Sequence, residues 1–457
     1  MKPMYLTEIC EKIGTTSQEK ALITKVANSI NDIDNNTLVF YLNRVVELDI
    51  DKFNTLKNCY IITDRSLLTS ENVDLNKFIF VEDCVKAYYE FINAYRNQFQ
   101  LPIVAITGTC GKTTTKEMIK QILENDYNVK ATIGNRNSLS FNHEYIFSID
   151  DKTEYGVFET AITSPGNLIY GCNIFKPSIG VITNIGIDHL NGCRTLDNYI
   201  RTKSEMLAGL QYKGTLIINN DCENTKKINM KPFKGKIITF GINNDSDYKA
   251  SNIKFKDLGM EFTLNCNKGK YQVYVPGIGI HNVYNALAAL SALSTLGLYL
   301  PLCINYLKNV KFIRSHTEVL KGKNGSTIID DTWSSNPTSV FAAFDTLKEY
   351  EKGKVKIVVI GRISYLGEFA TKYYEEIGRK FYEDGFDFIF TTDSFSKQIA
   401  KSAIKHGFNP AYHIHCKNNE ELKSKLGSLL DKNTIVLFKT SMLDQSITSV
   451  IKQLIDN

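Results

Sequence analysis

The sequence predicts an α/β fold of two or three domains with mostly parallel sheets. The chain has 457 residues, which is too long for a single hydrophobic core. Short apolar runs alternate with amphipathic segments, as is typical of strands joined by crossover helices. One such run, residues 103–106, leads through glycines directly into a helix, which indicates a phosphate-binding domain in the middle of the chain.

The overall composition is that of an ordinary globular protein. The chain is 43% hydrophobic and 23% charged, and its net charge of +5 is not concentrated in a Lys/Arg block, so no nucleic-acid partner is expected. Ten cysteines without a Cys-x-x-Cys pair indicate reduced thiols. No apolar run follows Met1, so no signal peptide is visible and a cytoplasmic protein is predicted.

Residues 1–99 read as a small α/β domain. Strand-like runs occupy 37–42 and 59–63, and a helical pattern covers 83–99. The dipeptide Leu101-Pro102 follows as a domain boundary. No motif in this region identifies a ligand.

The next segment predicts a phosphate loop. An apolar strand turns on Gly108 and Gly111 and opens a helix whose stripe contains Met118, Ile119, Ile122 and Leu123. Backbone N–H groups at such a helix start face an anion, Lys112 can reach the terminal phosphates, and the Thr113 hydroxyl can ligate Mg²⁺. The motif is shortened, because the usual first glycine is Ile106. An ordinary strand-turn-helix corner with a solvated lysine is the alternative.

Two further strands end in residues that suit metal binding. Residues 155–158 lead to Glu159, and 178–183 lead to Asn184 and then His189. Ligands lie beyond the carboxyl ends of strands in open α/β sheets, so these side chains are expected to converge with Lys112. A carboxylate and an imidazole beside a triphosphate are natural Mg²⁺ ligands. Taken singly, Glu159 reads as a solvated carboxylate and His189 as a satisfied loop histidine.

A helix over roughly 195–209 carries Lys203 on its apolar stripe. Burial disfavours the ammonium form, and a neutral lysine amine can react with CO₂. The alternative is a lysine that extends out of a groove to the solvent.

Residues 271–307 contain no Asp, Glu, Lys or Arg. Polar residues and Pro301 interrupt this stretch, which predicts two short buried helices joined near Gly297 rather than a membrane span. Asn282 lies near the start of the first helix, where an N-cap is the simplest interpretation and contact with a base edge is the alternative. Arg314 follows in a predicted linker.

The rest of the chain alternates strands and helices and predicts a second doubly wound domain. A strand at 326–329 ends in Asp330-Asp331, and further strands are expected at 356–360, 386–391 and 434–438. His413 and His415 share one face of a short strand, for which a metal pair is the less favoured interpretation.

The order and spacing of these motifs resemble the Mur ligases from about residue 103 to the C-terminus. The resemblance rests on Thr107–Thr115, Gly134-Asn-Arg-Asn137, Val157-Phe-Glu159, Ile182–Gly186 with His189-Leu190, Lys203-Ser-Glu205, His281–Ala288, Ile329-Asp-Asp331 with Asn336-Pro337, and Lys439-Thr-Ser441.

This resemblance implies three domains: an N-terminal α/β substrate-binding domain (1–99), a central P-loop ATPase domain with a mostly parallel sheet (100–313), and a C-terminal Rossmann-like ligase domain (314–457). It implies an ATP-dependent ligase that joins a carboxylate to an amine through an acyl phosphate and releases ADP. The expected partners are small-molecule or peptide substrates, without nucleic acid or membrane insertion, and the expected state is a monomer.

The resemblance also assigns roles by position. It implies that Lys112, Lys203, His189 and Arg314 act in catalysis. The nucleotide contacts would be Gly108, Thr109, Gly111, Lys112, Thr113, Thr114, Asn282, Asn285, Arg314 and Asp331. Thr113 and Glu159 would hold one Mg²⁺, and His189 with a carbamylated Lys203 the second. The substrate contacts would be Asn135, Asn137, Asn184, Asn336, Lys439 and Ser441.

Three departures from the family pattern concern the substrates. The N-terminal region lacks the family's Asp-Ser-Arg signature, Tyr-Asn-Ala-Asn-Pro appears as Trp333-Ser-Ser-Asn336-Pro337, and Gly-Asp-Met appears as Gly361-Arg362-Ile363. The favoured hypothesis is therefore a cell-wall ligase that adds a dipeptide, or a specialised ligase for another peptide or metabolite. The alternatives are an inactive nucleotide-binding regulatory protein and a P-loop kinase or motor-type ATPase.

Overall fold

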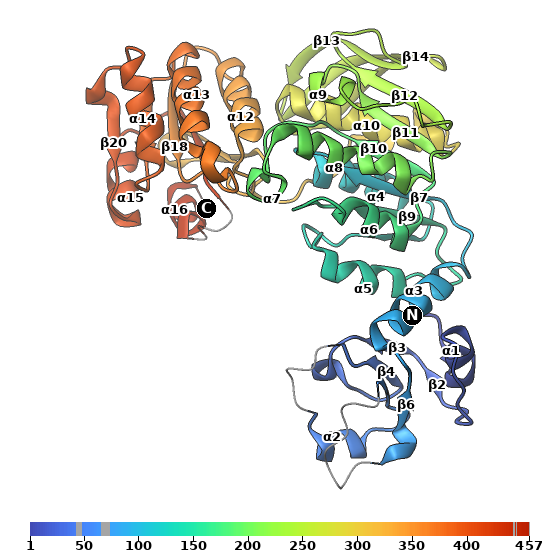
Figure 1. Cartoon of the computed structure of the whole chain (residues 1–457). Coiled ribbons are helices and arrows are strands. Elements are labelled where there is room, and N and C mark those ends of the chain that lie inside the picture. The colour runs from blue at the N-terminus through green and yellow to red at the C-terminus, as the bar shows by residue number, and fades with distance from the viewer. Residues whose placement is uncertain (43–47, 65–73, 442–443, 445, 457) are drawn as a thin grey trace.

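The structure is a computed structural model that describes residues 1–42, 48–64, 74–441, 444 and 446–456. The chain forms three α/β lobes in sequence order, each around its own sheet system (Figure 1). The predicted three-domain α/β fold is confirmed. The expected boundaries at 99/100 and 313/314 lie in the segments between the sheets of successive lobes.

The N-terminal lobe is a small parallel sheet with helices around it. A two-stranded antiparallel pair, β1 (Met4–Tyr5) with β2 (Leu22–Ile23), lies beside a four-stranded parallel sheet in the order β3-β4-β5-β6. These four strands are β3 (Lys25–Ala27), β4 (Thr37–Phe40), β5 (Tyr60–Thr63) and β6 (Phe78–Phe80). The helices are α1 (Leu6–Lys12), α2 (Ile50–Thr55) and α3 (Cys84–Arg96).

The central lobe is built on a nine-stranded sheet in the order β15-β14-β13-β12-β11-β10-β7-β9-β8. Neighbouring strands are parallel from β8 to β13, and only the pairs β13–β14 and β14–β15 are antiparallel. The strands are β7 (Ile103–Thr107), β8 (Val129–Ala131), β9 (Tyr155–Glu159), β10 (Ile179–Ile182), β11 (Thr215–Asn219), β12 (Lys236–Gly241), β13 (Tyr248–Lys256), β14 (Gly259–Cys266) and β15 (Gly269–Pro276).

Helices cover both faces of this sheet, because its central strands are apolar on both sides. One core combines the strands with α4 (Lys112–Leu123), α10 (Ile280–Thr295) and α11 (Leu300–Leu307). A second core lies under α6 (Asn167–Phe175) and α8 (Leu196–Gly209). The shorter helices are α5 (Asn142–Phe147), α7 (Leu190–Cys193) and α9 (Glu223–Lys226).

The uncharged stretch contains the two predicted helices, α10 and α11, on either side of Gly297, whose φ is 88°. Its first six residues differ from the prediction, because they form the last six of the eight residues of strand β15. Among the described residues, no helix has the length and hydropathy needed to cross a membrane.

The C-terminal lobe is a six-stranded sheet in the order β16-β17-β21-β18-β19-β20, antiparallel only between β16 and β17. Its strands are β16 (Glu318–Lys321), β17 (Thr327–Asp330), β18 (Val355–Ile360), β19 (Phe388–Thr391), β20 (His413–His415) and β21 (Thr434–Lys439). Its helices are α12 (Pro337–Glu349), α13 (Ala370–Glu383), α14 (Ser396–Lys405), α15 (Asn419–Gly427) and α16 (Ser446–Leu454). The rings of His413 and His415 each hydrogen-bond the Thr391 hydroxyl at 3.1 Å.

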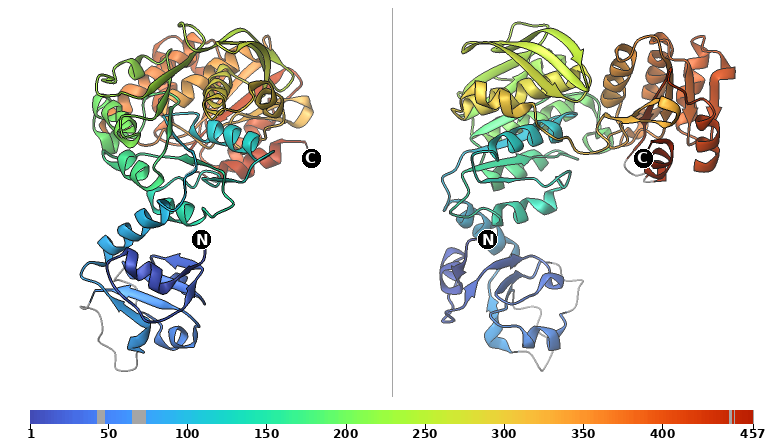
Figure 2. Two further views of the ribbon diagram at one scale, coloured as in Figure 1. Left: turned by 90° about the vertical axis from the view of Figure 1, so that its right-hand side faces the viewer. Right: turned by 180° about the vertical axis from the view of Figure 1, so that it is seen from behind.

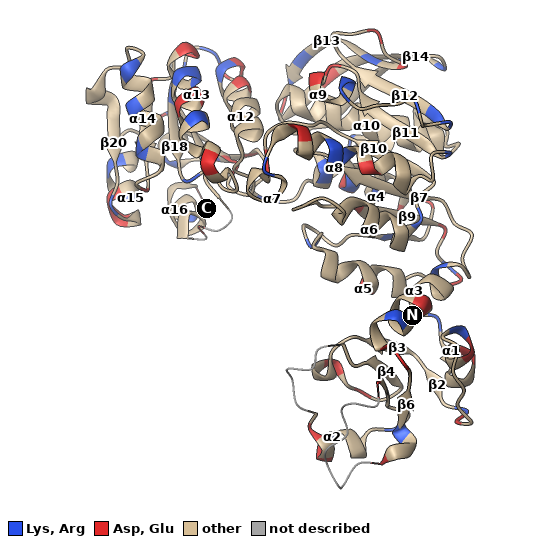
Figure 3. Cartoon of the chain, in the orientation of Figure 1, with Lys and Arg blue, Asp and Glu red and all other residues tan. Residues whose placement is uncertain are grey.

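The two outer lobes meet the central lobe on different sides (Figure 2). One hydrophobic core runs without interruption from the N-terminal lobe into the central lobe and includes Phe91, Tyr95, Phe158 and Phe175. The buried Arg96 reinforces this junction, since its guanidinium donates to the carbonyls of Phe99 (2.6 Å) and Phe175 (2.8 Å). Charged residues of both signs are interspersed along the helices (Figure 3).

Candidate active site

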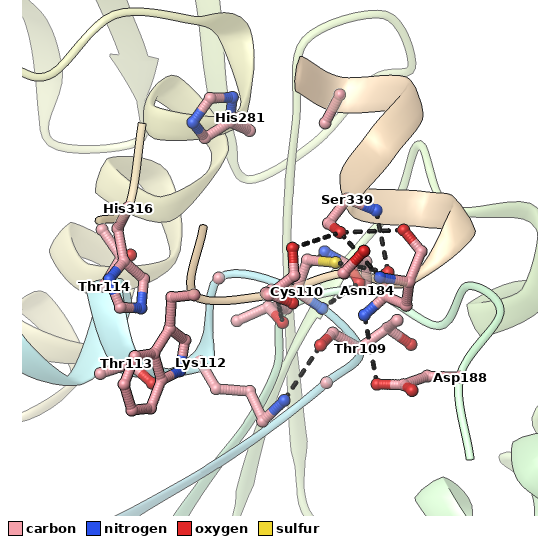
Figure 4. A pocket seen from close by; sticks show the side chains of 18 of the residues that line it. Thr109, Cys110, Lys112, Thr113, Thr114, Asn184, Asp188, His281, His316 and Ser339 are labelled. Atoms are coloured by element: carbon pink, nitrogen blue, oxygen red, sulfur yellow. Dashed lines mark hydrogen bonds between the residues drawn. The ribbon is translucent and has the colours of Figure 1, made fainter. Parts of the chain in front are cut away.

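A cavity of about 430 Å³ lies between the central and C-terminal lobes. The loops that follow β7, β9 and β10 form one side, and the loops that follow β17 and β21 close the other. In Figure 4, Cys110 and Asn184 of the central lobe lie close to Ser339 of α12. Parallel strands from two sheets therefore direct their carboxyl ends toward one space, as expected for a ligand site.

The predicted phosphate loop joins β7 to α4. Gly108 and Gly111 have φ values of 151° and 80°, which favour glycine, and Gly111 is the N-cap of α4. A Cβ on Gly111 would lie 2.1 Å from Asn285 Oδ1, so helix α10 also requires glycine there. Lys112 Nζ donates to the Thr109 carbonyl at 3.0 Å, and the first turn of α4 faces the cavity. These features are those of a binding site for a phosphate group.

Glu159 is buried at the end of β9 and is not the solvated carboxylate of the alternative interpretation. Its Oε2 accepts a hydrogen bond from Thr113 Oγ1 at 2.8 Å, and its Oε1 accepts one from Asn137 Nδ2 at 2.5 Å. A hydroxyl and a carboxylate in contact at the start of a phosphate-binding helix are oxygen donors of the type that Mg²⁺ prefers. This pair fits the predicted metal role.

Lys203 is 1% exposed, so the interpretation of a lysine that reaches the solvent is wrong. Its Nζ donates to Thr107 Oγ1 at 3.0 Å and to the Gly108 carbonyl at 2.9 Å. Burial above all, and then the charge of Lys112, hold the pKa of Lys203 well below its usual value. The neutral amine that reacts with CO₂ is therefore favoured.

His189 lines the same cavity in the left-handed conformation, with φ of 49°. Its ring stacks on Tyr365 of the C-terminal lobe, with 5.2 Å between the centroids. Burial lowers the pKa of His189 despite the opposing effect of Asp188, so the ring favours the neutral form that can ligate a metal. No group of three or more His, Cys, Asp or Glu residues that could hold a metal occurs within the described ranges.

The amides of α10 form another wall, and one prediction about them is wrong. Asn282 is not an N-cap, because Gly279 (φ 102°) caps the helix and Asn282 lies inside its first turn. Its Nδ2 donates to the Ile278 carbonyl at 3.1 Å, and its Oδ1 accepts from Asn285 Nδ2 at 3.3 Å. Both amides border the cavity, where contact with a base remains a prediction.

The C-terminal lobe contributes a buried ion pair. Lys439 Nζ donates to Asp331 Oδ2 at 2.6 Å, and Asp331 Oδ1 accepts from the Thr317 N–H at 3.2 Å. Lys439 is fully buried and also contacts the Ser334 carbonyl. The pair thereby fixes the loop that follows β17 against the cavity.

The predicted substrate residues all line the cavity, and several also have structural contacts. Asn184 Oδ1 accepts from the Cys110 N–H at 3.0 Å. Asn336 caps α12 and donates to Asp188 Oδ2 at 3.2 Å, which links the two lobes. Ser441 Oγ lies 3.2 Å from Ser364 Oγ. Asn135 differs from these, because its Oδ1 is buried without a hydrogen-bond partner.

Arg314 is the one predicted site residue that does not line the cavity. It is exposed in the segment between α11 and β16, so its contact with the terminal phosphate remains a prediction. Other lining residues were not predicted, among them Asp188, His281, Tyr284, His316 and Tyr365. Asp188 carried a usable signal, since it directly precedes His189 after a strand end, and His281 and Tyr284 lie within the motif at residues 281–288.

Comparison with known proteins agrees with this geometry. The model of the Mur ligase middle domain matches residues 106–293, and the model described as Mur ligase, glutamate ligase domain, matches residues 317–442. The two matches cover the central and the C-terminal lobe, in the expected order. The chain belongs to the Mur ligase family. The Mur ligase resemblance seen in the sequence is confirmed.

Curated Mur ligases of one kind are similar over most of the chain. The UDP-N-acetylmuramoyl-tripeptide--D-alanyl-D-alanine ligase of Bacillus subtilis (strain 168) is 27% identical over 379 residues, which are 83% of this chain and 81% of the relative. The ligase of the same name from Escherichia coli (strain K12) is 28% identical over 342 residues, with 74% and 75% covered.

Solved Mur ligases have the same three-lobed fold. A crystal structure of MurF from Acinetobacter baumannii superposes with a TM-score of 0.86 at 23% identity and covers 99% of each chain. The MurF ligase from Thermotoga maritima, solved in complex with ADP, gives a TM-score of 0.80 at 21% identity, with 94% and 97% covered.

Proposed function

We propose that this chain is an ATP-dependent ligase that joins a carboxylate to an amine, in the manner of the relatives named for addition of D-alanyl-D-alanine to UDP-N-acetylmuramoyl-tripeptide. The observation that carries the proposal is the convergence of Lys112, Glu159, His189 and Lys203 on one cavity between two lobes. A protein that only bound a nucleotide would not need a buried lysine and a buried carboxylate beside the phosphate loop.

The reaction proceeds in two steps. An oxygen of the substrate carboxylate bonds to the γ-phosphorus of ATP, and the bond from that phosphorus to the β-phosphate oxygen breaks, which gives an acyl phosphate and ADP. The amine nitrogen then bonds to the acyl carbon, the bond to the phosphate oxygen breaks, and the nitrogen gives up a proton. The amide and inorganic phosphate are the products.

The protein's main task is to let two anions approach each other. Lys112 and the N–H groups at the start of α4 would bind the β- and γ-phosphates. Thr113 and Glu159 would hold one Mg²⁺, and His189 would contribute to a second; bound Mg²⁺ neutralises phosphate charge in such sites. Asn282 and Asn285 would face the base, and Asp331 the ribose.

Lys203 would act as a carbamate. Its neutral amine would add to CO₂ and release one proton, which converts a nitrogen donor into a carboxylate beside His189. The low pKa of Lys203, which burial causes, supports this modification.

A second candidate is a ligase of the same chemistry with different substrates. It is favoured by the amine side of the cavity, where Trp333, Ser334 and Ser335 replace the family's Tyr-Asn-Ala. Arg362, which replaces the family's acidic residue, is exposed outside the cavity, but Ser364 and Tyr365 that follow it line the cavity. An added cation and added hydroxyl groups would change which amine is accepted.

The decisive experiment measures ADP release with pairs of carboxylates and amines. UDP-N-acetylmuramoyl-tripeptide with D-alanyl-D-alanine is the first pair, and unrelated peptides and amines are the others. We expect ADP release to require both substrates, and hydroxylamine to trap the acyl phosphate as a hydroxamate when the amine is left out. ATP hydrolysis that needs no carboxylate and yields no hydroxamate would contradict the ligase proposal. Turnover of another pair alone would favour the second candidate.

A further inference from the structure

Lys116 is a fully buried lysine that the proposed reaction does not use. It lies one turn after Lys112 on α4, but it points away from the cavity into the loop that follows β8. Its Nζ donates to the carbonyls of Thr132 at 2.8 Å and Gly134 at 3.0 Å, and it contacts Glu117 Oε1. A buried ammonium is costly unless every donor is paired, so three such partners indicate a specific structural task.

Lys116 holds residues 132–137. This segment hydrogen-bonds Glu159 at two points, its backbone N–H and its carboxylate. Thr132 Oγ1 accepts from the Glu159 N–H at 2.9 Å, and Asn137 Nδ2 donates to Glu159 Oε1 at 2.5 Å. The same segment carries Asn135, whose buried Oδ1 has no partner and which lines the cavity. An unpaired buried amide oxygen is unfavourable, and a rotation of the Asn135 side chain toward the cavity would let it accept a hydrogen bond from a substrate N–H group.

A second anchor secures the outer part of the segment. The hydroxyl of the buried Tyr145 donates to the Arg136 carbonyl at 2.7 Å and accepts from the Ile133 N–H at 3.3 Å. The side chain of Ile133 itself is 63% exposed and contributes little packing. The segment therefore depends on polar tethers rather than on an apolar core of its own.

We infer that Lys116 is a positioning residue, which tethers residues 132–137 so that Asn137 orients Glu159 and Asn135 meets the carboxylate substrate. This inference rests on the proposed function for its kinetic consequence, but the tether itself does not. Lys116 touches neither nucleotide nor substrate in this arrangement. Its loss should therefore weaken the carboxylate side of the site and leave nucleotide binding without Mg²⁺ in place.

The variants must remove the tether without leaving a buried charge. Lys116→Met combined with Glu117→Gln removes both charges of the close pair, because Glu117 would otherwise keep only Gln121 and the more distant Lys120 as partners and could destabilise α4 by itself. Lys116→Gln combined with Glu117→Gln keeps an NH₂ group that can donate to the two carbonyls and should restore part of the tether. This variant carries the test if the methionine variant does not fold. Lys120→Met is the matched control, since Lys120 is on the same helix and near Glu117 but bonds no carbonyl of the segment. Tyr145→Phe removes the second anchor.

The first measurement is amide hydrogen exchange of the full-length protein, which requires no activity. We expect exchange in a peptide covering 132–138 to accelerate about tenfold in the methionine variant, less in the glutamine variant, and not at all in the Lys120→Met control. Unchanged exchange in both Lys116 variants would overturn the inference.

The second measurement separates binding of the two substrates. We expect KM for the carboxylate substrate to rise about tenfold, because a group that orients Glu159 is lost. Kd for ADP, measured without Mg²⁺ so that Glu159 is not involved, should stay within about threefold. An equal loss of ADP affinity would mean that Lys116 only stabilises the fold, and would overturn the inference. If the wild-type protein ligates no pair, the proposed function fails, whereas the exchange data still decide whether the tether exists.

Discussion

At the scale of single residues, the site gathers basic and acidic side chains around one cavity. Lys112, Lys203 and His189 lie around the space that the phosphates would occupy, and the buried Glu159 lines the same cavity. Burial strengthens each of these interactions, because the surrounding dielectric constant is low. It also lowers the pKa of both Lys203 and His189, which favours their neutral forms, the ones that can react or ligate.

Replacement of Lys203 by alanine tests the catalytic role of this lysine. We expect ADP release to fall about 100-fold or more, because one preorganised group of the transition-state environment is lost. Kd for ADP, measured by calorimetry, should change little. Short carboxylic acids added to the Lys203→Ala variant should restore part of the turnover, since they can occupy the position of the carbamate. The exposed Lys213→Ala variant is the control and should behave as wild type.

The lowered pKa of Lys203 also predicts how stability depends on pH. In CO₂-free buffer the unfolded chain binds a proton at this lysine up to about pH 10.4, whereas the folded chain releases it at lower pH. The unfolding free energy of wild type should therefore rise with pH through this window, relative to Lys203→Met. Denaturant unfolding of both proteins at several pH values measures the difference. A difference that fell with increasing pH would show that the folded state favours the ammonium.

At the scale of elements, the N-terminus of α12 links packing to function. Asn336 forms a capping box with Ser339 and also donates to Asp188 of the central lobe. The first contact stabilises the helix, and the second keeps the helix start against the cavity.

Two substitutions separate these contacts. Asn336→Ala should lower the unfolding free energy by about 1 kcal/mol through loss of the cap. Asn336→Asp keeps a capping oxygen but places a carboxylate against Asp188, so we expect a smaller loss of stability at low pH than at neutral pH. Ser339→Ala is the matched control, because it removes the other half of the capping box and a bond to the Ser334 carbonyl but leaves the contact between Asn336 and Asp188. Equal losses for both Asn336 variants at all pH values would contradict this division of roles.

The strands and helices that form the site were the most predictable part of the structure. The strands β7, β9 and β10 and helix α8 were found where the sequence places them, because short apolar runs end at polar residues with useful chemistry. Lys203 could be located on a buried face from spacing alone, but its two hydrogen-bond partners could not.

Other features depend on backbone geometry or on distant contacts. The N-cap of α10 was assigned to Asn282, whereas two glycines with positive φ, Gly277 and Gly279, start the helix earlier. The tether from Lys116 to residues 132–137 joins segments without a local sequence signal. The outer wall formed by Tyr365 and His316 required the C-terminal lobe to be placed first.

At the scale of the whole molecule, the residues that line the cavity are divided between lobes. The phosphate loop belongs to the central lobe, while Asp331 and Lys439 belong to the C-terminal lobe. Arg314, in the segment that connects them, is exposed and outside the cavity. For Arg314 to reach a phosphate, this segment must move when the substrates bind.

Small-angle scattering tests this movement. We expect the radius of gyration to decrease when ADP and the carboxylate substrate are added together, because closure excludes water from the acyl phosphate.

Arg314→Ala should lower kcat about 100-fold through loss of transition-state stabilisation. Its Kd for ADP should remain close to wild type, and the exposed Lys308→Ala variant in the same region is the control. An unchanged kcat in Arg314→Ala would exclude the arginine from catalysis.

The shared core between the first two lobes restricts how the chain can be divided. Phe158 and Phe175 stack with 4.4 Å between their centroids, and the Tyr95 hydroxyl donates to the Ile149 carbonyl at 2.6 Å across the same junction. A truncated protein that starts at residue 100 would leave this aromatic surface facing water, together with carbonyls that Arg96 normally satisfies. Such a fragment would be prone to aggregate, so engineering by domain exchange between Mur ligases should keep residues 1–313 as a single cassette.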